Sequence, residues 1–462
     1  KENYIFFALR GANLNGADYI PNAIENGCKV IVCSNEEEGI EDKYKDMVIL
    51  KHSNPRWLLG EFLRVFYKEK PSNIFGITGT KGKTSVTEYV RQTLQNLGYN
   101  TASLGTLGIK TKDNSYRKDT LTMTDTVTLH KELNGLKLNN NIDYVIMEMT
   151  SQGMFQERSA GVNIKVGAFT NFSRDHLECH GNMEEYFRCK MILFRNILKN
   201  GSPVVLNADI KEYNEIRKIC EEKEHKILTY GENGDIKLMN VIPNRNGQKI
   251  VFKYKEKQYE LNTNLIGNFQ APNLLCAFGI VVSSGIDKTP AEIVEVLQNV
   301  KPAEGRADLA GITKTGASVY VDYAHTPDSL EKILITMKDH IKATKPGRII
   351  LVFGAGGDRD PSKRPIMGKV AKDYADVIYV TEDNPRNEDP AQVRKGIMEG
   401  CPNAIEIMDG REHAIREAIK NSKDGDIIIL AGKGHEKYIM GKNLEKTYFN
   451  EFEIVKDAIE NQ

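Results

Sequence analysis

The chain of 462 residues has no net charge, no long apolar run and no paired cysteines. Lys and Arg together number 63, as do Asp and Glu, so no overall basic field would attract nucleic acid or an anionic membrane. No apolar stretch is long enough to span a bilayer. The seven cysteines are scattered and never form C-x-x-C, which argues against a disulfide framework and a zinc site. We therefore expect a cytoplasmic protein with reduced thiols and with no nucleic-acid or membrane partner.

The length predicts about three domains, at roughly 150 residues per domain. Residues 1–71 show a small α/β pattern that ends in a polar, proline-containing linker. Residues 72–301 open with the strand, glycine-rich turn and helix of a nucleotide-binding βαβ unit, and an Asn246-Gly247 turn predicts an antiparallel hairpin at its edge. Residues 302–462 alternate short apolar strands with helices. The predicted fold class is α/β, with a small N-terminal domain, a central P-loop ATPase-like domain and a C-terminal doubly wound, Rossmann-like domain.

Polar clusters follow four predicted strands of the third domain. The strands are expected at 318–323, 349–353, 377–380 and 427–430. The clusters at their ends contain Asp322, Gly356, Asp383 and Gly432. In open α/β sheets, ligands bind at the carboxyl ends of the strands. We therefore expect the four clusters to converge on one site.

A glycine-rich loop at 76–85 is the strongest local motif, because it lies between a predicted strand and a predicted helix. Backbone N–H groups at a helix N-terminus form a cradle for phosphate. Lys83 can reach the outer phosphates, and the Thr84 or Ser85 hydroxyl can bind Mg²⁺. Ile77 stands where the strict G-x-x-x-x-G-K pattern has its first glycine. The loop alone leaves a kinase, a GTPase and a ligase open, beside a turn that binds no ligand.

Five motifs follow one another along the chain. They are Gly-Thr-Lys-Gly-Lys-Thr-Ser at 79–85, Asn-Phe-Ser-Arg-Asp-His at 171–176, Tyr-x-x-x-Lys at 186–190, Asp-Tyr-Ala-His-Thr-Pro at 322–327 and Gly-Lys-Gly-His-Glu at 432–436. In this order they resemble the Mur ligase family of peptidoglycan synthesis over essentially the whole chain. Within that family, residues 354–360 and the Asp-Asn-Pro-Arg segment at 383–386 resemble the members that add meso-diaminopimelate.

The resemblance implies an ADP-forming, ATP-dependent ligase that adds meso-diaminopimelate to UDP-N-acetylmuramoyl-L-alanyl-D-glutamate through an acyl phosphate. It implies a UDP-sugar-binding N-terminal domain, a central ATP-binding domain and a C-terminal amino-acid-binding domain. Because three anionic reactants must approach one another, two Mg²⁺ ions and fixed cations have to neutralise their charge. We expect a monomer whose partners are these small molecules.

The family match also implies roles for single residues. ATP would be held by Gly79, Thr80, Lys81, Gly82, Lys83, Thr84 and Ser85, with Asn273, Arg306, Asp322 and His325 around the base, the ribose and the phosphates. The implied catalytic residues are Lys83, Glu148, His176 and Lys190, of which Lys190 would be carbamylated by CO₂. The implied ligands of Mg²⁺ are Thr84, Glu148, His176 and the Lys190 carbamate.

Lys190 and Glu148 each have a plainer interpretation. In its apolar helical segment Lys190 would lose its charge and become nucleophilic, but without the family match a snorkelling surface lysine would be preferred. Glu148 closes an apolar strand, where a ligand for a hard cation is reasonable. It could also be a solvated charge at a strand end. A lone histidine such as His325 is more often structural than ligand-binding.

The family match also implies residues that bind the two substrates, the amino acid and the UDP-sugar. Arg386 can bind the distal carboxylate of meso-diaminopimelate through a planar two-point fork that a lysine cannot imitate. The implied amino-acid-binding residues are Arg359, Asp383, Asn384, Arg386, Gly432 and Glu436. The implied residues for the UDP-sugar substrate are Thr122, Ser151 and Arg158. The segment 383–386 could instead be a turn with a capping Asp.

The sequence departs from the family pattern in three places. Thr122-Met123-Thr124 replaces the usual Thr-Thr-Pro, and 150–152 reads Thr-Ser-Gln in place of Ser-Ser-His. The uridine-binding segment is absent, and since the chain begins at Lys1 without Met we expect residues upstream of a truncated N-terminal domain. Two alternatives stay open: a related ligase for L-lysine or another amino acid, such as folylpolyglutamate synthetase, and a P-loop nucleotide hydrolase or binding protein without ligase activity.

Overall fold

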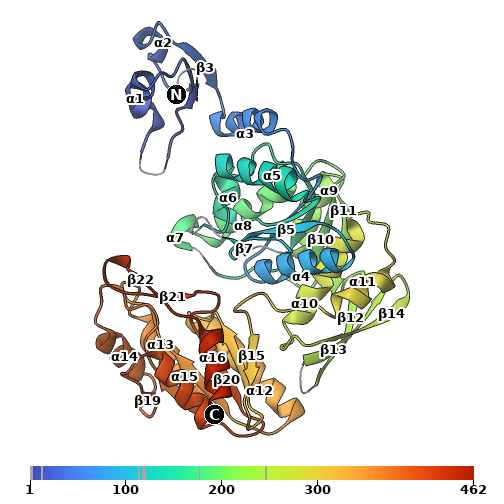
Figure 1. Cartoon of the computed structure of the whole chain (residues 1–462). Helices are drawn as coiled ribbons and strands as arrows, with labels where there is room; N and C mark the ends of the chain where they lie inside the picture. The colour runs from blue at the N-terminus through green and yellow to red at the C-terminus, as the bar shows by residue number, and fades with distance from the viewer. Residues whose placement is uncertain (1–3, 12–13, 113–114, 117–120, 176, 245–246) are drawn as a thin grey trace. The chain divides into compact units, whose positions relative to one another are not determined.

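The computed structural model describes residues 4–11, 14–112, 115–116, 121–175, 177–244 and 247–462 (Figure 1). The chain divides into two compact units. Unit 1 comprises Lys1–Thr87, Leu94–Leu228 and Ser283–Gly285, and unit 2 comprises Glu88–Thr93, Thr229–Val282 and Ile286–Gln462. Within the described ranges, none of the helices combines the length and the apolar character needed to cross a bilayer.

Unit 1 begins with a parallel sheet in the order β1-β2-β3. Its elements are β1 (Ile5–Phe7), α1 (Ile20–Glu25), β2 (Val30–Ser34), α2 (Ile40–Lys43) and β3 (Val48–His52). A small core around Ile20, Ile31 and Cys33 holds them together. Helix α3 (Pro55–Phe66) follows. Asn54 caps its start, because the Asn54 side chain accepts a hydrogen bond from the Trp57 N–H.

The main sheet of unit 1 has the strand order β10-β9-β4-β8-β5-β6-β7. Its strands are β4 (Asn73–Thr78), β5 (Thr101–Gly105), β6 (Gly108–Lys110), β7 (Ser115–Tyr116), β8 (Tyr144–Glu148), β9 (Ile164–Phe169) and β10 (Pro203–Asn207). Strands β5, β8, β4, β9 and β10 are parallel, whereas β6 and β7 are antiparallel. The carboxyl ends of β4, β5 and β8 therefore lie at one edge.

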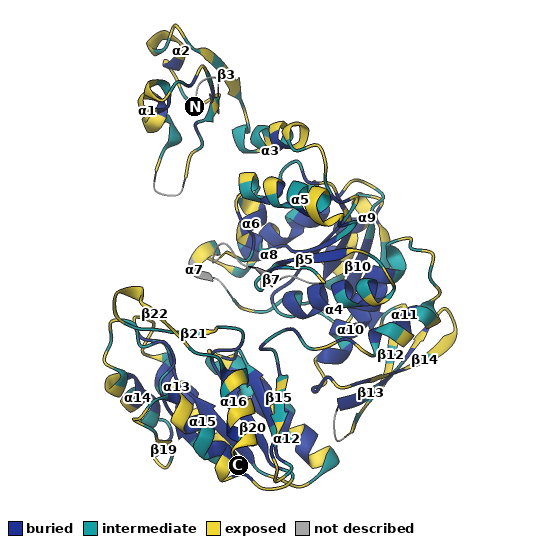
Figure 2. Cartoon of the chain, in the orientation of Figure 1, coloured by how far each residue is buried: buried dark blue, intermediate teal, exposed yellow. Residues whose placement is uncertain are grey.

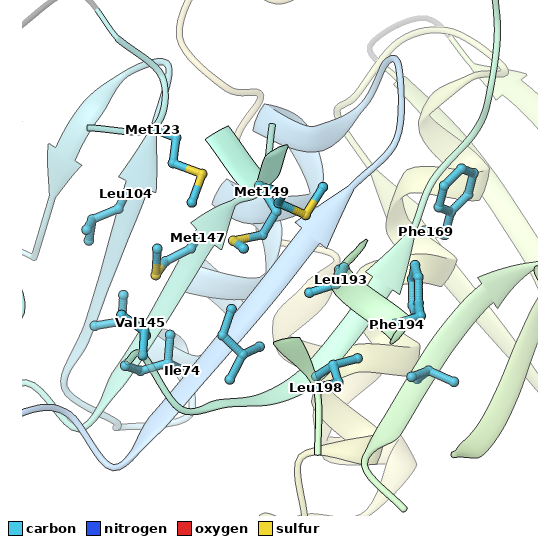
Figure 3. Packing of buried hydrophobic residues seen from close by; sticks show 14 of the residues in the cluster. Ile74, Leu104, Met123, Val145, Met147, Met149, Phe169, Leu193, Phe194 and Leu198 are labelled. Carbon is cyan, nitrogen blue, oxygen red and sulfur yellow. The ribbon is translucent and has the colours of Figure 1, made fainter. Parts of the chain in front are cut away.

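Helices cover this sheet and close its core. They are α5 (Thr126–Asn140), α6 (Ser151–Phe155), α7 (Leu177–His180), α8 (Met183–Ile192), the π-helical turn η2 (Leu193–Ile197) and α9 (Tyr213–Glu222). Figure 3 shows Met123, Met147 and Met149 close together in this core, and Phe169 next to Phe194 with ring centroids 6.3 Å apart. The packed side chains hold the ends of β4 and β8 in place.

Unit 2 contains a meander and two helices beside residues 88–93 of α4 (Lys83–Asn96). The elements are β11 (Lys226–Gly231), β12 (Ile236–Asn244), β13 (Gly247–Tyr254), β14 (Lys257–Thr263), α10 (Gln270–Ser283) and α11 (Pro290–Leu297). Strands β12 and β13 are antiparallel, so the predicted hairpin is confirmed. Asn246 lies outside the described residues, and Gly247 pairs with Asn244 and belongs to β13 rather than to a turn.

The C-terminal part of unit 2 is a sheet in the order β15-β16-β20-β17-β18-β19. The strands are β15 (Asp308–Ile312), β16 (Ser318–Asp322), β17 (Ile349–Phe353), β18 (Val377–Val380), β19 (Ile405–Glu406) and β20 (Ile427–Ala431). All neighbours are parallel except β15, which is antiparallel to β16. Every residue of β17 and β20 is buried (Figure 2), as their unbroken apolar sequences require in a sheet covered on both faces.

Two layers of helices cover the C-terminal sheet, and the expected doubly wound fold is confirmed. Side chains of α12 (Pro327–Thr344), α13 (Lys363–Tyr374) and α14 (Pro390–Met398) form one core with the sheet, and those of α15 (Arg411–Lys420) and α16 (Glu451–Glu460) form the other. A short ribbon of β21 (Tyr438–Met440) and β22 (Lys446–Tyr448) lies between β20 and α16 in the chain.

A buried ion pair joins the starts of α15 and α16 to the strand ends. Arg411, 1% exposed, donates from Nε to Oε1 of Glu451 at 2.8 Å and from Nη2 to the Ala431 carbonyl at 2.9 Å. Burial raises the pKa of Glu451 above its usual value, although Arg411 opposes the shift. Because both partners are buried, removal of one would leave an uncompensated charge.

We predict that Arg411→Met lowers the free energy of unfolding by about 3–5 kcal/mol, since it leaves the Glu451 carboxylate without its cation. Urea denaturation followed by circular dichroism measures the change. Lys420→Met, at an exposed position of the same helix, serves as the control and should change stability by less than about 1 kcal/mol. The double variant Arg411→Met/Glu451→Leu should recover most of the loss. A loss for Arg411→Met no larger than for the control would contradict this account.

Candidate active site

The glycine-rich loop joins β4 to α4 and is braced from the neighbouring strand. Gly79 has φ 139°, and a Cβ there would lie 2.0 Å from Oγ1 of Thr170, so only glycine fits. Asn171 clamps the loop, because its Oδ1 accepts from the Lys81 N–H at 2.8 Å and its Nδ2 donates to the Lys81 carbonyl at 2.9 Å. Lys83 Nζ donates to the carbonyls of Gly79 and Thr80 at 3.0 and 2.8 Å. The loop is thus a preformed cradle with a cation at its mouth.

Glu148 ends β8 with a carboxylate that is 2% exposed, so its interpretation as a solvated charge is wrong. Thr84 Oγ1 donates to its Oε2 at 3.0 Å. Thr106, just after β5, donates its N–H to Oε1 at 2.8 Å and its hydroxyl to Oε2 at 3.2 Å. Gly105 makes room, because a Cβ there would lie 2.2 Å from Oε1. Thr106 was missed by sequence reasoning, since no motif includes it.

This donor set fits Mg²⁺. The ion prefers oxygen ligands in a small shell and is usually bound through one or two carboxylates together with substrate phosphates and water. Glu148 and Thr84 supply a carboxylate and a hydroxyl beside the loop that carries Lys83. Over the part of the chain that the structure describes, no three or more His, Cys, Asp and Glu side chains are grouped so that they could hold a metal ion. His176, a predicted ligand, lies outside the described residues.

Lys190 points from α8 to the same loop and is 1% exposed, so the snorkelling interpretation is wrong. Its Nζ donates to the Gly79 carbonyl at 2.7 Å and lies 4.4 Å from the ring centroid of Tyr186. Burial, and next the nearby charge of Lys83, lower the pKa of Lys190 well below the ordinary lysine value. Two amino groups, those of Lys83 and Lys190, therefore share one carbonyl oxygen, and the buried one favours its neutral form.

The three residues predicted for the UDP-sugar substrate lie near β5, β8 and the helices that follow. Thr122 Oγ1 is 3.1 Å from the Thr106 hydroxyl. Ser151 Oγ is 3.0 Å from Nε2 of His180. Sequence reasoning noted that Gln152 leaves this segment without an imidazole, and His180 from α7 brings one to Ser151. The contact between the Thr122 and Thr106 hydroxyls joins Thr122 to Glu148, because Thr106 also donates to that carboxylate.

Arg158 has a neighbour that sequence reasoning also missed. Its Nε and Nη2 both donate to Oε1 of Gln156, at 3.0 and 2.6 Å. The motif search found no sign of Gln156, although its spacing of two residues from Arg158 places it within reach.

The residues predicted around the nucleotide base and ribose belong to unit 2. Asp322, at the end of β16, accepts from the N–H groups of Ala307 and Ala324 at 2.7 and 2.8 Å. The Arg306 guanidinium lies 4.9 Å from the ring centroid of Tyr323, and His325 Nδ1 is 2.8 Å from the Tyr323 carbonyl. These groups form one cluster after β16.

Asn273 lies apart in sequence, in the first turn of α10. Its Nδ2 is 3.4 Å from Oε1 of Gln270, and that oxygen also accepts from the Tyr89 hydroxyl at 2.8 Å. The amide nitrogen of Gln270 is buried without a hydrogen-bond partner among the described residues, and the motifs did not predict this residue.

Three of the four expected strand-end clusters meet around Asn384, and the fourth, after β16, adjoins them, because the Gly432 N–H donates to the Asp322 carbonyl at 3.0 Å and the ring centroids of Tyr323 and His435 lie 5.1 Å apart. Its Nδ2 donates to Oε2 of Glu436 at 2.9 Å, and its backbone carbonyl accepts from the Gly357 N–H at 2.9 Å. Arg386 Nη1 donates to the Gly357 carbonyl at 2.8 Å. Gly432 has φ 120°, and a Cβ there would lie 2.3 Å from Oδ2 of Asp383. These residues follow β17, β18 and β20, as the topology predicts.

Arg359 and Arg386 flank one glycine in this cluster. A Cβ on Gly356 would lie 2.7 Å from Nη1 of Arg386 and 3.6 Å from Cγ of Arg359, which is exposed. Arg386 has φ 54°, a left-handed conformation that is uncommon for a side chain of this size. The helix after the cluster is capped by Asp389, not by Asp383, so the capping interpretation of Asp383 is wrong.

Comparisons with known proteins agree with this arrangement. The chain matches the Mur ligase family, catalytic domain over residues 1–67, the Mur ligase middle domain over 77–281 and the Mur ligase, glutamate ligase domain over 305–434. A UDP-N-acetylmuramoyl-L-alanyl-D-glutamate--2,6-diaminopimelate ligase from Zymomonas mobilis subsp. mobilis is 39% identical over 462 residues, which cover 99% of this chain and 92% of that protein. The chain therefore belongs to the Mur ligase family, and the resemblance seen in its motifs is confirmed.

Solved structures show the same fold. One of a UDP-N-acetylmuramoyl-L-alanyl-D-glutamate--2,6-diaminopimelate ligase matches with a TM-score of 0.74 and 28% identity, covering 100% of this chain and 93% of that one. A bifunctional folylpolyglutamate synthase/dihydrofolate synthase matches with a TM-score of 0.60 and 19% identity, covering 83% and 93%, and this likeness shows the fold alone. The predicted fold class is confirmed. The predicted domain boundaries, after residues 71 and 301, stay predictions.

We predict that Lys190→Met stabilises the protein near neutral pH. A lysine whose pKa is lowered on folding binds fewer protons folded than unfolded, so wild-type stability rises with pH up to the ordinary lysine value. The variant lacks this dependence, and its advantage in free energy of unfolding should shrink between about pH 7 and about pH 10. Urea denaturation in CO₂-free buffer measures it, with the exposed Lys199→Met as control. A variant less stable than wild type at about pH 7, or a difference that is constant with pH, would contradict the neutral, buried amine.

Proposed function

We propose that this member of the Mur ligase family is the ATP-dependent ligase that joins meso-diaminopimelate to UDP-N-acetylmuramoyl-L-alanyl-D-glutamate during synthesis of peptidoglycan precursors. The relative of 39% identity that carries this activity in its name matches along almost the whole chain. The observation that carries the proposal is the cluster after β17, β18 and β20, because it offers an arginine, an amide and a carboxylate to a ligand with a charged distal end. The P-loop hydrolase alternative has no use for that cluster.

The reaction proceeds through an acyl phosphate. An oxygen of the acceptor carboxylate bonds to the γ-phosphorus of ATP while the bond between that phosphorus and the bridging oxygen breaks, and ADP leaves. The amino nitrogen of meso-diaminopimelate then bonds to the acyl carbon, and the bond from that carbon to the phosphate oxygen breaks. The ammonium group loses two protons on its way to the amide: one ends on the released phosphate, and the other passes to water.

The loop residues bind and orient the phosphates. Asn171 holds the N–H groups of Thr80 and Lys81, so the phosphates are proposed to meet the N–H groups at the start of α4 and the Lys83 ammonium, in positions set before the reaction begins. Glu148 and Thr84, held by Thr106, would bind Mg²⁺, which when bound supplies positive charge to the phosphate oxygens. His176 is proposed as a ligand of the second ion.

Lys190 is proposed as a carbamate in the active enzyme. A neutral amine adds CO₂ with loss of a proton, and burial beside Lys83 favours the neutral amine. The carbamate would place a negative charge beside Lys83, so the repulsion between the two amino groups would become an attraction.

The remaining residues bind substrates. Asn273, Arg306, Asp322 and His325 are proposed to hold the base and ribose of ATP. Thr122, Ser151 and Arg158 are proposed to hold the UDP-sugar acceptor, with Gln156 and His180 as their direct neighbours. Asp383, Asn384, Arg386, Arg359, Gly432 and Glu436 are proposed to hold meso-diaminopimelate. A cytoplasmic location and a monomeric state stay predictions.

The experiment that tests the function is release of phosphate from ATP and Mg²⁺ in the presence of UDP-N-acetylmuramoyl-L-alanyl-D-glutamate. Three reactions are compared: one with meso-diaminopimelate, one with L-lysine and one without an amino acid. Release that requires both the acceptor and meso-diaminopimelate is expected. Release with L-lysine in its place would favour the related ligase, and release without the acceptor would favour a nucleotide hydrolase.

Arg386→Lys should raise the KM for meso-diaminopimelate by about 10- to 100-fold, because the lysine loses one hydrogen bond of a charged two-point pair. The KM for ATP should stay unchanged. Arg348→Lys, at the amino end of β17, is the matched control and should leave both values unaltered. Equal increases in both KM values for Arg386→Lys would show that Arg386 does not set specificity.

A further inference from the structure

Lys433 lies between Gly432 and Gly434 just after β20, as the first residue of a turn, and its ammonium group lies in the interior. The side chain is 0% exposed. Its Nζ donates to Oδ1 of Asn384 at 2.8 Å and to Oε2 of Glu436 at 3.1 Å. A lysine is almost never fully buried unless it is paired, so this position needs a reason. Neither the motifs nor the proposed reaction gave Lys433 a role.

The backbone of the turn aims Lys433 and Glu436 at the same point. The Glu436 N–H donates to the Lys433 carbonyl at 3.0 Å, and this hydrogen bond closes a four-residue turn from Lys433 to Glu436. Gly432 and Gly434, on either side of Lys433, have φ 120° and 56°, conformations that glycine adopts without strain. Lys433 can therefore turn inward immediately after the buried strand β20.

The contacts of Lys433 determine which way the Asn384 amide faces. Oδ1 of Asn384 accepts from both Lys433 Nζ and the Met440 N–H, each at 2.8 Å, so the Nδ2 end must face Glu436. Without Lys433, Oδ1 would keep only the Met440 N–H, one of its two donors. Lys433 thus reinforces the arrangement in which Asn384 is a donor towards the site.

The same ammonium sets the state of Glu436. Burial alone would raise the pKa of this carboxyl, but the charge of Lys433 and the Asn384 amide outweigh it and lower the pKa below its usual value. His435 and Tyr323 are the other titratable groups that face Glu436. The hydrogen bonds that Glu436 receives from described residues end on Oε2, so Oε1 is left to a ligand. A charged carboxylate in this place suits an ammonium group.

We propose that Lys433 is a positioning residue for the amino-acid substrate: its hydrogen bonds to Asn384 and Glu436 hold the two side chains so that the pair can bind the zwitterionic distal end of a diamino dicarboxylic acid. The proposal rests on the proposed function of the same cluster. Lys433 itself does not touch the substrate, since its hydrogen bonds are to Asn384 and Glu436.

The test is a double-mutant cycle on the KM for meso-diaminopimelate with Lys433→Met, Glu436→Gln and the double variant. Each single change should raise this KM by about 10- to 100-fold, the effect of a lost hydrogen bond to a charged group. The KM of the double variant should exceed that of the more impaired single variant by no more than about threefold, because both changes remove the same interaction. The KM for ATP should not change in any of them.

A pH profile separates positioning from mere stability. In Lys433→Met the pKa of Glu436 should rise, so the acid limb of kcat/KM for meso-diaminopimelate should move to higher pH. Lys446→Met is the matched control, since Lys446 is exposed and its Nζ lies 4.1 Å from the centroid of the same Tyr438 ring that Lys433 faces at 5.5 Å. This control should alter neither the KM nor the profile.

Three results would overturn the proposal: an unchanged KM for meso-diaminopimelate in Lys433→Met, additive effects in the double variant, or an equal rise in the KM for ATP. If Lys433→Met does not fold, the double variant decides, because it removes both charges and leaves no unpaired carboxylate. Its KM should then match that of Glu436→Gln, and a KM more than about tenfold higher would contradict the proposal. A wild-type protein that does not use meso-diaminopimelate would instead refute the proposed function.

Discussion

The geometry of the phosphate loop depends on one contact: two lysine amino groups donate hydrogen bonds to the same backbone carbonyl oxygen. Lys83 and Lys190 both donate to the Gly79 carbonyl, at 3.0 and 2.7 Å, from different helices. Two ammonium ions so close would repel each other, and burial favours the neutral form of Lys190. The loop, the helix that begins at Lys83 and helix α8 therefore place a neutral amine beside Lys83, which is the form that the proposed carbamate requires.

The C-terminal cluster also holds charged groups close together, but there each positive side chain is paired with a negative one. A zwitterionic ligand needs charges fixed before it arrives, since flexible groups would lose entropy on binding. Lys433 and Glu436 are paired behind the surface, and Arg411 and Glu451 are paired deeper at the ends of β18 and β20. Such pairs add little net stability, but the loss of one partner is severe. The chain has no net charge, so charges that face a ligand have to be arranged locally, as they are here.

Most of the fold could be predicted where the sequence carries an unbroken pattern. Strands such as β17 and β20 are continuous apolar runs, and the polar clusters after them were expected at one edge. The edge strands β15 and β19 could not be predicted, because β15 includes the exposed Leu309 and Ile312 and β19 has two residues. The candidate site shows the same division. Most motif residues were found, whereas Thr106 acts through a contact with Glu148, 42 residues away, and Lys433 is buried against the usual exposure of lysine although it lies inside a motif. Gln156 contacts the nearby Arg158, but no motif includes it.

The central claim is that the acceptor carboxylate, and not water, receives the phosphoryl group held by this loop. Transfer of ¹⁸O from an acceptor labelled in that carboxylate tests it most directly, by mass spectrometry of the released phosphate. The account predicts one labelled oxygen in each phosphate released with meso-diaminopimelate present. Unlabelled phosphate formed at the same rate as the amide would contradict the acyl phosphate, and with it the role given to the loop.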